Sequence, residues 1–216
     1  MNRRFFTLTI TCLLLMQCNA LAQSQDVPKY EIGGEFITLE RESLFSGQKT
    51  EPGVGVRFTY NINGNIALEA AGYLFPDRCF NCTQNGRMTE VVAGVKAGKR
   101  FEKWGIFAKA RPGVVSFSQG DANIVALTPG GPVPFQLDLS RNTSFATDFG
   151  GVIEFYPSRK IVTRFDVGDT LIHFKSRTIN FVQVNPLTGD ISLFPSLQPA
   201  RTTHNFQFSA GVGFRF

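Results

Sequence analysis

A strict alternation of apolar residues with polar residues or glycine runs through the last thirteen positions of the chain, HNFQFSAGVGFRF. Successive side chains of a β-strand point to opposite faces, so this stretch predicts a strand with one apolar and one polar face. Seven further stretches repeat the pattern, and no helical period follows the N-terminal segment. The eight predicted strands are Tyr30–Glu40, Gly53–Ile62, Ile66–Phe75, Met88–Arg100, Gly105–Phe117, Ser144–Tyr156, Ile161–Phe174 and His204–Phe216.

The connections between these strands are alternately short and long. Asn63-Gly64 predicts a tight hairpin turn, and the strands on either side of 101–104 and of 157–160 are almost as close. The long connections are Arg41–Pro52, Pro76–Arg87, Ser118–Thr143 and Lys175–Thr203. In an antiparallel meander, all short turns then lie at one end and all long loops at the other, as in outer-membrane barrels.

Such a sheet can close in two ways. With the apolar face inside it is a soluble, lipocalin-like cup, and with the apolar face outside it is a barrel in lipid. Glycines crowd the polar face, which favours a small interior over a soluble surface. The apolar face also carries aromatic residues near strand ends, as expected of interfacial girdles. These residues are Tyr30, Tyr60, Phe155, Phe206, Phe214 and Phe216.

The polar face carries equal numbers of acidic and basic residues. An unpaired charge in a closed interior costs several kcal/mol, so balanced charges favour a lumen of ion pairs over a solvated surface. Eight strands enclose a lumen that side chains can fill, and we therefore expect a plugged barrel and no open pore. The predicted network is Glu35, Arg57, Glu69, Glu90, Lys96, Lys109, Arg111, Asp148, Glu154, Arg164, Asp166 and Arg215.

The N-terminus predicts export. Arg3 and Arg4 precede an apolar stretch that is too short for a transmembrane helix, and Ala20-Leu21-Ala22 forms a cleavage site. Residues 1–22 are therefore the expected secretory signal peptide and residues 23–216 the barrel domain. An alternative is lipidation at Cys18, although Gln17 is larger than the residue that usually precedes a lipidated cysteine.

Charge excludes one class of partner. The formal net charge is +5, and it falls to +3 when Arg3 and Arg4 leave with the signal (5 − 2). A surplus this small, spread evenly along the chain, argues against nucleic-acid binding.

The segments YEIGGEF, GVGVRFTYNINGNIALEA, RFDVGD and AGVGFRF resemble the small eight-stranded outer-membrane barrels of the OmpA/OmpX-like family. The resemblance extends over nearly the whole exported chain. It implies an all-β, antiparallel, up-and-down transmembrane barrel in the outer membrane of a Gram-negative bacterium. It also implies that the barrel-assembly machinery recognises the terminal aromatic, so Phe216 is the expected assembly signal.

The residues that could carry chemistry are few. Cys79 and Cys82 are separated by two residues in a predicted loop, and in an oxidising compartment they predict a local disulfide. His173 and His204 lie at the ends of neighbouring strands and lack the further ligands that zinc usually requires. We expect no metal, no cofactor and no catalytic residues, because no Ser-His-Asp arrangement can be assembled.

These observations leave three functions open. The first is a structural or surface-interaction role, with membrane lipid and an unidentified extracellular partner as contacts. The second is a narrow channel for small solutes or ions, and the third is an enzyme that modifies lipid A. The loops Ser118–Thr143 and Lys175–Thr203 contain apolar residues, so they either extend the barrel, contact a partner or pack on themselves.

Overall fold

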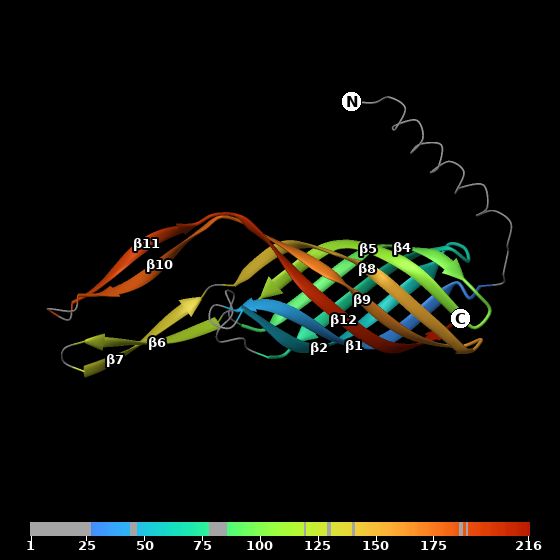
Figure 1. Cartoon of the computed structure of the whole chain (residues 1–216), viewed down its shortest axis with the longest axis horizontal. Helices are drawn as coiled ribbons and strands as arrows, with labels where there is room; N and C mark the ends of the chain where they lie inside the picture. The colour runs from blue at the N-terminus through green and yellow to red at the C-terminus, as the bar shows by residue number, and fades with distance from the viewer. Residues whose placement is uncertain are drawn as a thin grey trace, which may run out of the picture.

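Eight strands of the chain close into a single antiparallel barrel (Figure 1). The computed structural model describes residues 27–43, 47–77, 86–118, 120–128, 131–139, 141–185, 188 and 190–216. The expected signal peptide and the cysteine pair Cys79 and Cys82 lie outside these residues. The barrel strands are β1 (Tyr30–Ser43), β2 (Gly47–Asn61), β3 (Ile66–Phe75), β4 (Met88–Arg100), β5 (Trp104–Phe117), β8 (Asn142–Ser158), β9 (Ile161–Phe174) and β12 (Arg201–Arg215).

The first and last strands close the barrel. The strand order is β1-β12-β9-β8-β5-β4-β3-β2, so each strand neighbours the next barrel strand in the chain and β12 returns to β1. At the seam, Glu31 is opposite Arg215, and the backbones of Tyr30 and Phe216 exchange two hydrogen bonds of 2.9 Å. The predicted eight-stranded up-and-down barrel is confirmed.

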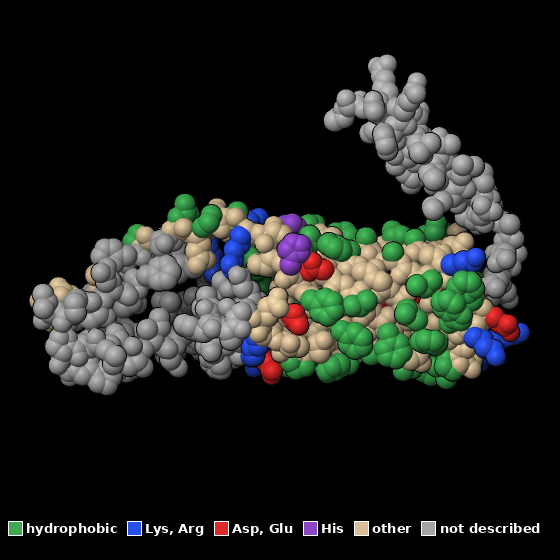
Figure 2. Space-filling model, in the orientation of Figure 1, with side chains coloured by type: hydrophobic (Ala, Val, Ile, Leu, Met, Phe, Trp, Pro, Cys, Tyr) green, Lys and Arg blue, Asp and Glu red, His purple; other side chains and the backbone are tan. Residues whose placement is uncertain are grey.

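Side chains alternate between the outside and the lumen along every barrel strand. On β3, for example, Leu68 is 46% exposed and its neighbour Glu69 only 3%. Large apolar side chains cover much of the outer surface in Figure 2, while most charged side chains of the barrel wall point inward. An apolar exterior around a charged interior is the reverse of a soluble protein, and it confirms the predicted lipid-facing orientation. No helix in the described part of the chain has the length and apolarity to cross a membrane.

Tight turns join the strands at one end of the barrel. Asn63 Oδ1 accepts the backbone N–H groups of Asn65 and Ile66 at 2.8 Å, which fixes the β2–β3 turn. Phe101 N–H donates to the carbonyl of Trp104 at 2.7 Å in the β4–β5 turn. Because short turns face the periplasm in barrels of this type, this is the periplasmic end.

Two β-hairpins project from the opposite, outer end (Figure 1). One pairs β6 (Gly120–Thr128) with β7 (Gly131–Leu139), and the other pairs β10 (Arg177–Val184) with β11 (Ile191–Gln198). They occupy the predicted long loops Ser118–Thr143 and Lys175–Thr203, which are therefore largely regular structure.

The prediction of a loop over Arg41–Pro52 is wrong for most of these residues. The β1–β2 ladder continues from Leu39 opposite Glu51 to Ser43 opposite Gly47, beyond the point where apolar alternation stops. The backbone hydrogen bonds of a hairpin continue without an apolar face once the strands leave the lipid. This explains why the sequence pattern ended earlier than the strands.

Glycines on the lumen side let neighbouring backbones approach closely. A Cβ added to Gly150 would lie 2.2 Å from the carbonyl oxygen of Val167, whereas a Cβ on the adjacent, outward-facing Gly151 would meet no atom within 4 Å. Only the first position therefore needs glycine for packing.

This pair gives a matched test of the barrel geometry. Gly150→Ala forces β8 away from β9 and should lower the free energy of unfolding by about 1–3 kcal/mol, the usual range for overpacking. Gly151→Ala should leave it within about 0.5 kcal/mol. Urea unfolding of the refolded barrel in detergent measures both, and equal effects at the two positions would contradict the close approach of β8 to β9.

Candidate functional site

The lumen of the barrel is filled by charged side chains. Among the described residues, eight acidic and eight basic side chains are buried inside, so the interior is balanced. All twelve residues of the predicted network are among them. The predicted network did not include Glu31, Arg41, Glu51 and Arg100. Glu31 and Arg100 lie at lumen-facing positions of predicted strands, so alternation could have found them, whereas Arg41 and Glu51 lie in the predicted loop Arg41–Pro52, where there was no such signal.

Arg164 on β9 lies at the centre of this network. Its Nε is 2.9 Å from both carboxylate oxygens of Asp166, and its Nη2 donates to Glu69 Oε2 at 3.0 Å. Glu69 belongs to β3, which does not neighbour β9 in the sheet, so this ion pair crosses the lumen. Lys96 also belongs to this centre. Its ammonium group donates a hydrogen bond to Glu154, and its Nζ lies 3.3 Å from Glu69 Oε1.

Two further groups extend the network from this centre. Arg57 Nε donates to Glu35 Oε1 at 2.6 Å, and the hydroxyl of Tyr73 donates to the other oxygen of Glu35 at 2.9 Å. Arg111 joins this group to the next one, because it donates to Tyr73 at 3.2 Å and to Asp148 at 2.8 Å. The polar groups thus form one connected network and are not separate one-to-one pairs.

The periplasmic end of the lumen has its own cluster. Glu31 lies 3.3 Å from Arg215 Nε and 3.5 Å from Arg100 Nη2. Both guanidinium groups also lie over the ring of Tyr156, with Arg215 4.3 Å from its centroid. The Tyr156 hydroxyl donates to Glu154 at 2.9 Å, which connects this cluster to the centre.

Glu90 is the exception within the predicted network. The structure places it in the lumen with no exposed surface, but neither of its carboxylate oxygens accepts a hydrogen bond from a described residue. Its register neighbours are Val115 on β5, which has an apolar side chain, and Tyr73 on β3, whose hydroxyl donates to Glu35. The balanced charges of the polar face predicted an ion pair for Glu90, and among the described residues it has none.

An apolar cluster lies in the outer half of the lumen, together with buried polar groups such as the Arg41–Glu51 ion pair and Glu90. Arg41, bonded to Glu51 at 2.6 Å, lies 5.0 Å over the ring of Phe117, and Phe117 packs on Phe174 with centroids 5.9 Å apart. Below these aromatic rings, residues from six strands pack into one buried cluster. Its members are Ile37, Leu39, Ala71, Tyr73, Phe75, Met88, Val92, Val115, Phe117, Ala146 and Ile172. The charged network and the apolar cluster together fill the lumen.

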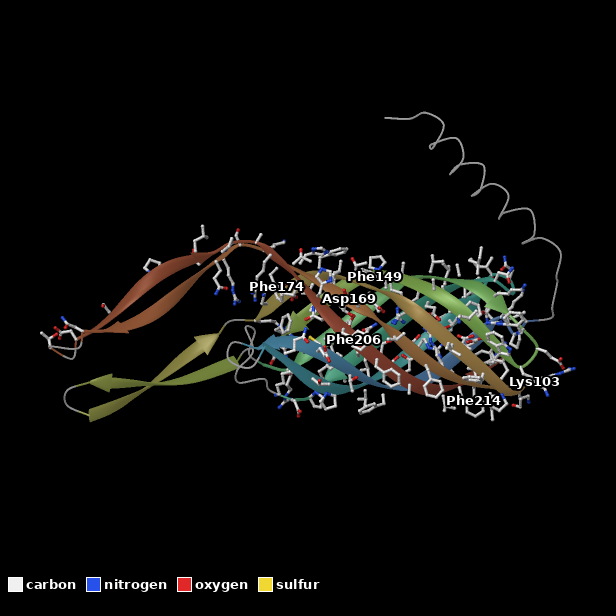
Figure 3. All side chains as sticks on the ribbon, in the orientation of Figure 1. Lys103, Phe149, Asp169, Phe174, Phe206 and Phe214 are labelled. Atoms are coloured by element: carbon white, nitrogen blue, oxygen red, sulfur yellow. The ribbon has the colours of Figure 1, made fainter. Side chains whose placement is uncertain are left out.

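The histidine side chains lie on the outside of the barrel (purple in Figure 2), and His204 contacts Asp169, which is labelled in Figure 3. His204 Nδ1 is 2.6 Å from Asp169 Oδ2, and His173 Nδ1 is 2.8 Å from the hydroxyl of Thr202. A hydrolase triad needs the hydroxyl and the carboxylate on one imidazole. Here they contact different histidines, so these residues do not assemble a triad. No three His, Cys, Asp or Glu side chains of the described residues are grouped to hold a metal ion.

Phe216, the predicted assembly signal, lies at the periplasmic end on the outer surface. Its ring stacks on Tyr30 with centroids 5.8 Å apart, and Tyr30 in turn packs on Tyr60 at 5.5 Å. Phe216 therefore contributes to an aromatic belt beside the β1–β12 seam. Its recognition by the assembly machinery stays a prediction.

Removal of Arg164 should be far more costly than removal of an exposed cation. Arg164→Met leaves Glu69 and Asp166 without their main partner and should lower the free energy of unfolding by about 3–5 kcal/mol. Arg159→Met, in the exposed β8–β9 turn, should change it by at most about 0.5 kcal/mol. Urea unfolding in detergent compares them.

A second substitution separates lost charge from lost packing. Arg164→Met combined with Glu69→Gln should recover part of the loss, because fewer buried carboxylates then lack a cation. No recovery, or similar losses for Arg164→Met and Arg159→Met, would contradict the central role of Arg164.

Comparison with known proteins gives no match to a protein-family model or to a curated protein sequence. Among solved structures the chain is similar to neisserial surface protein A, with 10% identity and a TM-score of 0.47 over 87% of this chain and 97% of that one. It is also similar to Ail, the attachment invasion locus protein of Yersinia pestis, in complex with the heparin analogue sucrose octasulfate. That match has 11% identity and a TM-score of 0.47, over 88% and 99% of the two chains.

A third similar structure is the outer membrane protease OmpT from Escherichia coli, with 10% identity and a TM-score of 0.31 over 88% of this chain and 97% of that one. The closed sheet, the lipid-facing apolar surface and the charged lumen make this chain a small eight-stranded outer-membrane β-barrel.

Proposed function

We propose that this barrel is a non-conducting membrane anchor that holds two hairpins at the cell surface for contact with an external partner. The filled lumen is the observation that carries the first half of the proposal. A channel needs a continuous water-filled path, whereas packed charged and apolar side chains fill this lumen. Arg57, Arg111 and Arg164, the largest side chains inside, have almost no exposed surface.

The hairpin β10–β11 supports the second half, because its root is basic. The β9–β12 ladder ends with Phe174 opposite Arg201, and β10–β11 begins three residues later with Arg177 opposite Gln198. Burial, together with the nearby guanidinium of Arg201, lowers the pKa of Arg177 below its ordinary value. Two guanidinium groups this close favour an anionic partner at the hairpin root.

With the residues that connect them to the barrel included, the two hairpin segments have opposite net charge. The segment from Lys175 to Arg201 contains three basic residues and one acid, Asp190, for a net charge of +2 (3 − 1). The segment 118–143 contains Asp121, Asp138 and Arg141, for a net charge of −1 (1 − 2). An anionic surface would therefore be attracted to one hairpin and repelled by the other.

The closed lumen predicts an absence of conductance. The purified protein, inserted in a planar lipid bilayer, should give no stable large current at any applied potential, because the apolar cluster around Phe117 excludes water and ions. A porin measured in the same bilayer serves as the positive control. Long-lived open levels from the wild-type protein would remove the proposal in favour of the channel.

The hairpin charges predict selective binding to an anionic polymer. Protein in which Lys175, Arg177 and Arg201 are all changed to Gln should lose binding to immobilised dextran sulfate, because these residues carry the positive charge of the segment. Protein with residues 120–139 replaced by Asn-Gly, which closes a two-residue turn, should bind at least as well as wild type, since it loses two acids. Neutral dextran is the control for charge, and binding that depends on neither hairpin would count against this role.

A further inference from the structure

Four exposed basic residues gather at the periplasmic end. Lys99 and Lys103 lie at the β4–β5 turn, and Arg159 and Lys160 lie at the β8–β9 turn. The two turns are neighbours, because β5 pairs with β8 and the backbone N–H of Tyr156 donates to the carbonyl of Lys103 at 2.9 Å. These four residues are called the basic sector below.

The basic sector differs from the charged lumen beside it. Inside the barrel, acidic and basic residues are equal in number, whereas the basic sector has one acidic neighbour, Glu102. Within the described part of the chain, none of the four basic residues lies in an ion pair. The third periplasmic turn, formed by Asn63, Gly64 and Asn65, carries no charge. Lys29, which precedes β1, is a further exposed basic residue at this end, and the four residues of the basic sector are grouped on two neighbouring turns.

The basic sector lies beside a group of aromatic residues that face the lipid. Trp104 is 43% exposed on the outer surface and stacks on Phe101 with centroids 4.3 Å apart. Phe155, opposite Trp104 in the β5–β8 ladder, is also exposed. Trp and other aromatic side chains concentrate at the boundary between the hydrocarbon and the headgroups. The basic sector is therefore at headgroup level.

Lys99 shows how the sector meets the lipid. It lies on β4 at an outward-facing position, and its Nζ is 5.4 Å from the centroid of Phe101. A lysine in this position lays its aliphatic stem along the apolar surface and places its ammonium group among the headgroups. Lys103 directly precedes Trp104 in the chain and lies at the end of the barrel in Figure 3, on the water side of the aromatic group.

We propose that the basic sector binds the phosphate groups of anionic phospholipids in the periplasmic leaflet. The unpaired positive charge supplies the attraction, and the position of Lys99 and Trp104 on the lipid-facing wall selects a lipid over a soluble anion. This contact is independent of the hairpins and of the external partner proposed above, since it lies at the other end of the barrel.

Trp104 makes the proposal directly measurable, because it is the single tryptophan of the chain. The full protein is reconstituted in phosphatidylcholine vesicles that contain brominated phosphatidylglycerol or, at the same mole fraction, brominated phosphatidylcholine. Bromine quenches tryptophan only at short range, so emission reports the lipid next to the basic sector. The brominated anionic lipid should quench Trp104 more strongly.

A pair of double variants identifies the residues responsible. Lys99→Gln with Lys103→Gln should reduce the preference for anionic lipid by up to about fivefold per cation removed, from about 1 kcal/mol for each basic residue near an anionic surface. Arg141→Gln with Lys175→Gln removes the same charge from exposed positions at the outer end and should leave the preference unchanged. Heat-modifiable gel migration confirms that each variant is folded.

Three outcomes would overturn the proposal. The first is equal quenching of the wild-type protein by the two brominated lipids. The second is an unchanged preference in the variant that lacks Lys99 and Lys103. The third is a response of Trp104 to soluble polyphosphate without any lipid preference, which would assign the sector to a soluble anion. None of these outcomes depends on whether the hairpins bind a partner.

Discussion

The absence of hydrogen-bonding partners in hydrocarbon is the constraint on which the whole structure depends. Every backbone N–H and C=O in the membrane must bond within the protein, so the sheet has to close on itself. The β1–β12 seam provides that closure, with paired backbones from Glu31 opposite Arg215 to Leu39 opposite Gln207. Closure of the sheet gives the molecule an inside and an outside, and the two-residue alternation of each strand then assigns every side chain to one of them.

Eight strands leave an interior that side chains can fill, and an unpaired charge inside is costly, so most of the buried charges pair and Glu90 is the exception among the described residues. Arg164 reaches Glu69 across the lumen, and Tyr73 and Tyr156 connect the ion pairs to one another. The apolar cluster then occupies the outer half. The lumen side chains are thus buried against one another, and the polar groups available for contact with other molecules lie on the hairpins and at the two rims.

The sequence predicted the barrel well because the alternation reflects, at each position, whether the side chain faces the lipid or the lumen. Along β3, each apolar residue placed outside, such as Leu68, is exposed, and Glu69 is inside. Alternation could not reveal which charges meet, because Arg164 and Glu69 come from strands that are not neighbours. Alternation also did not predict the apolar cluster, because Ile37 and Val115 lie on the face of their strands that also carries the charged residues.

The hairpins were read as loops for a related reason. Outside the lipid, a strand needs no apolar face, so β6 and β10 lack the signal by which the barrel strands were found. Turn-forming residues between the paired strands, such as Pro129-Gly130 and Asn185-Pro186, favoured irregular structure. The geometry at His173 and His204 depends on cross-strand register, which composition does not determine.

The ion pairs that cross the lumen also constrain how the molecule can be made. Glu69 is on β3, Lys96 on β4, Glu154 on β8 and Arg164 on β9, and they form one cluster although 95 positions separate the first from the last. A strand that entered the bilayer alone would carry its charges into hydrocarbon before their partners arrived. Insertion is therefore least costly when the strands that carry paired charges associate before or during their entry into the bilayer.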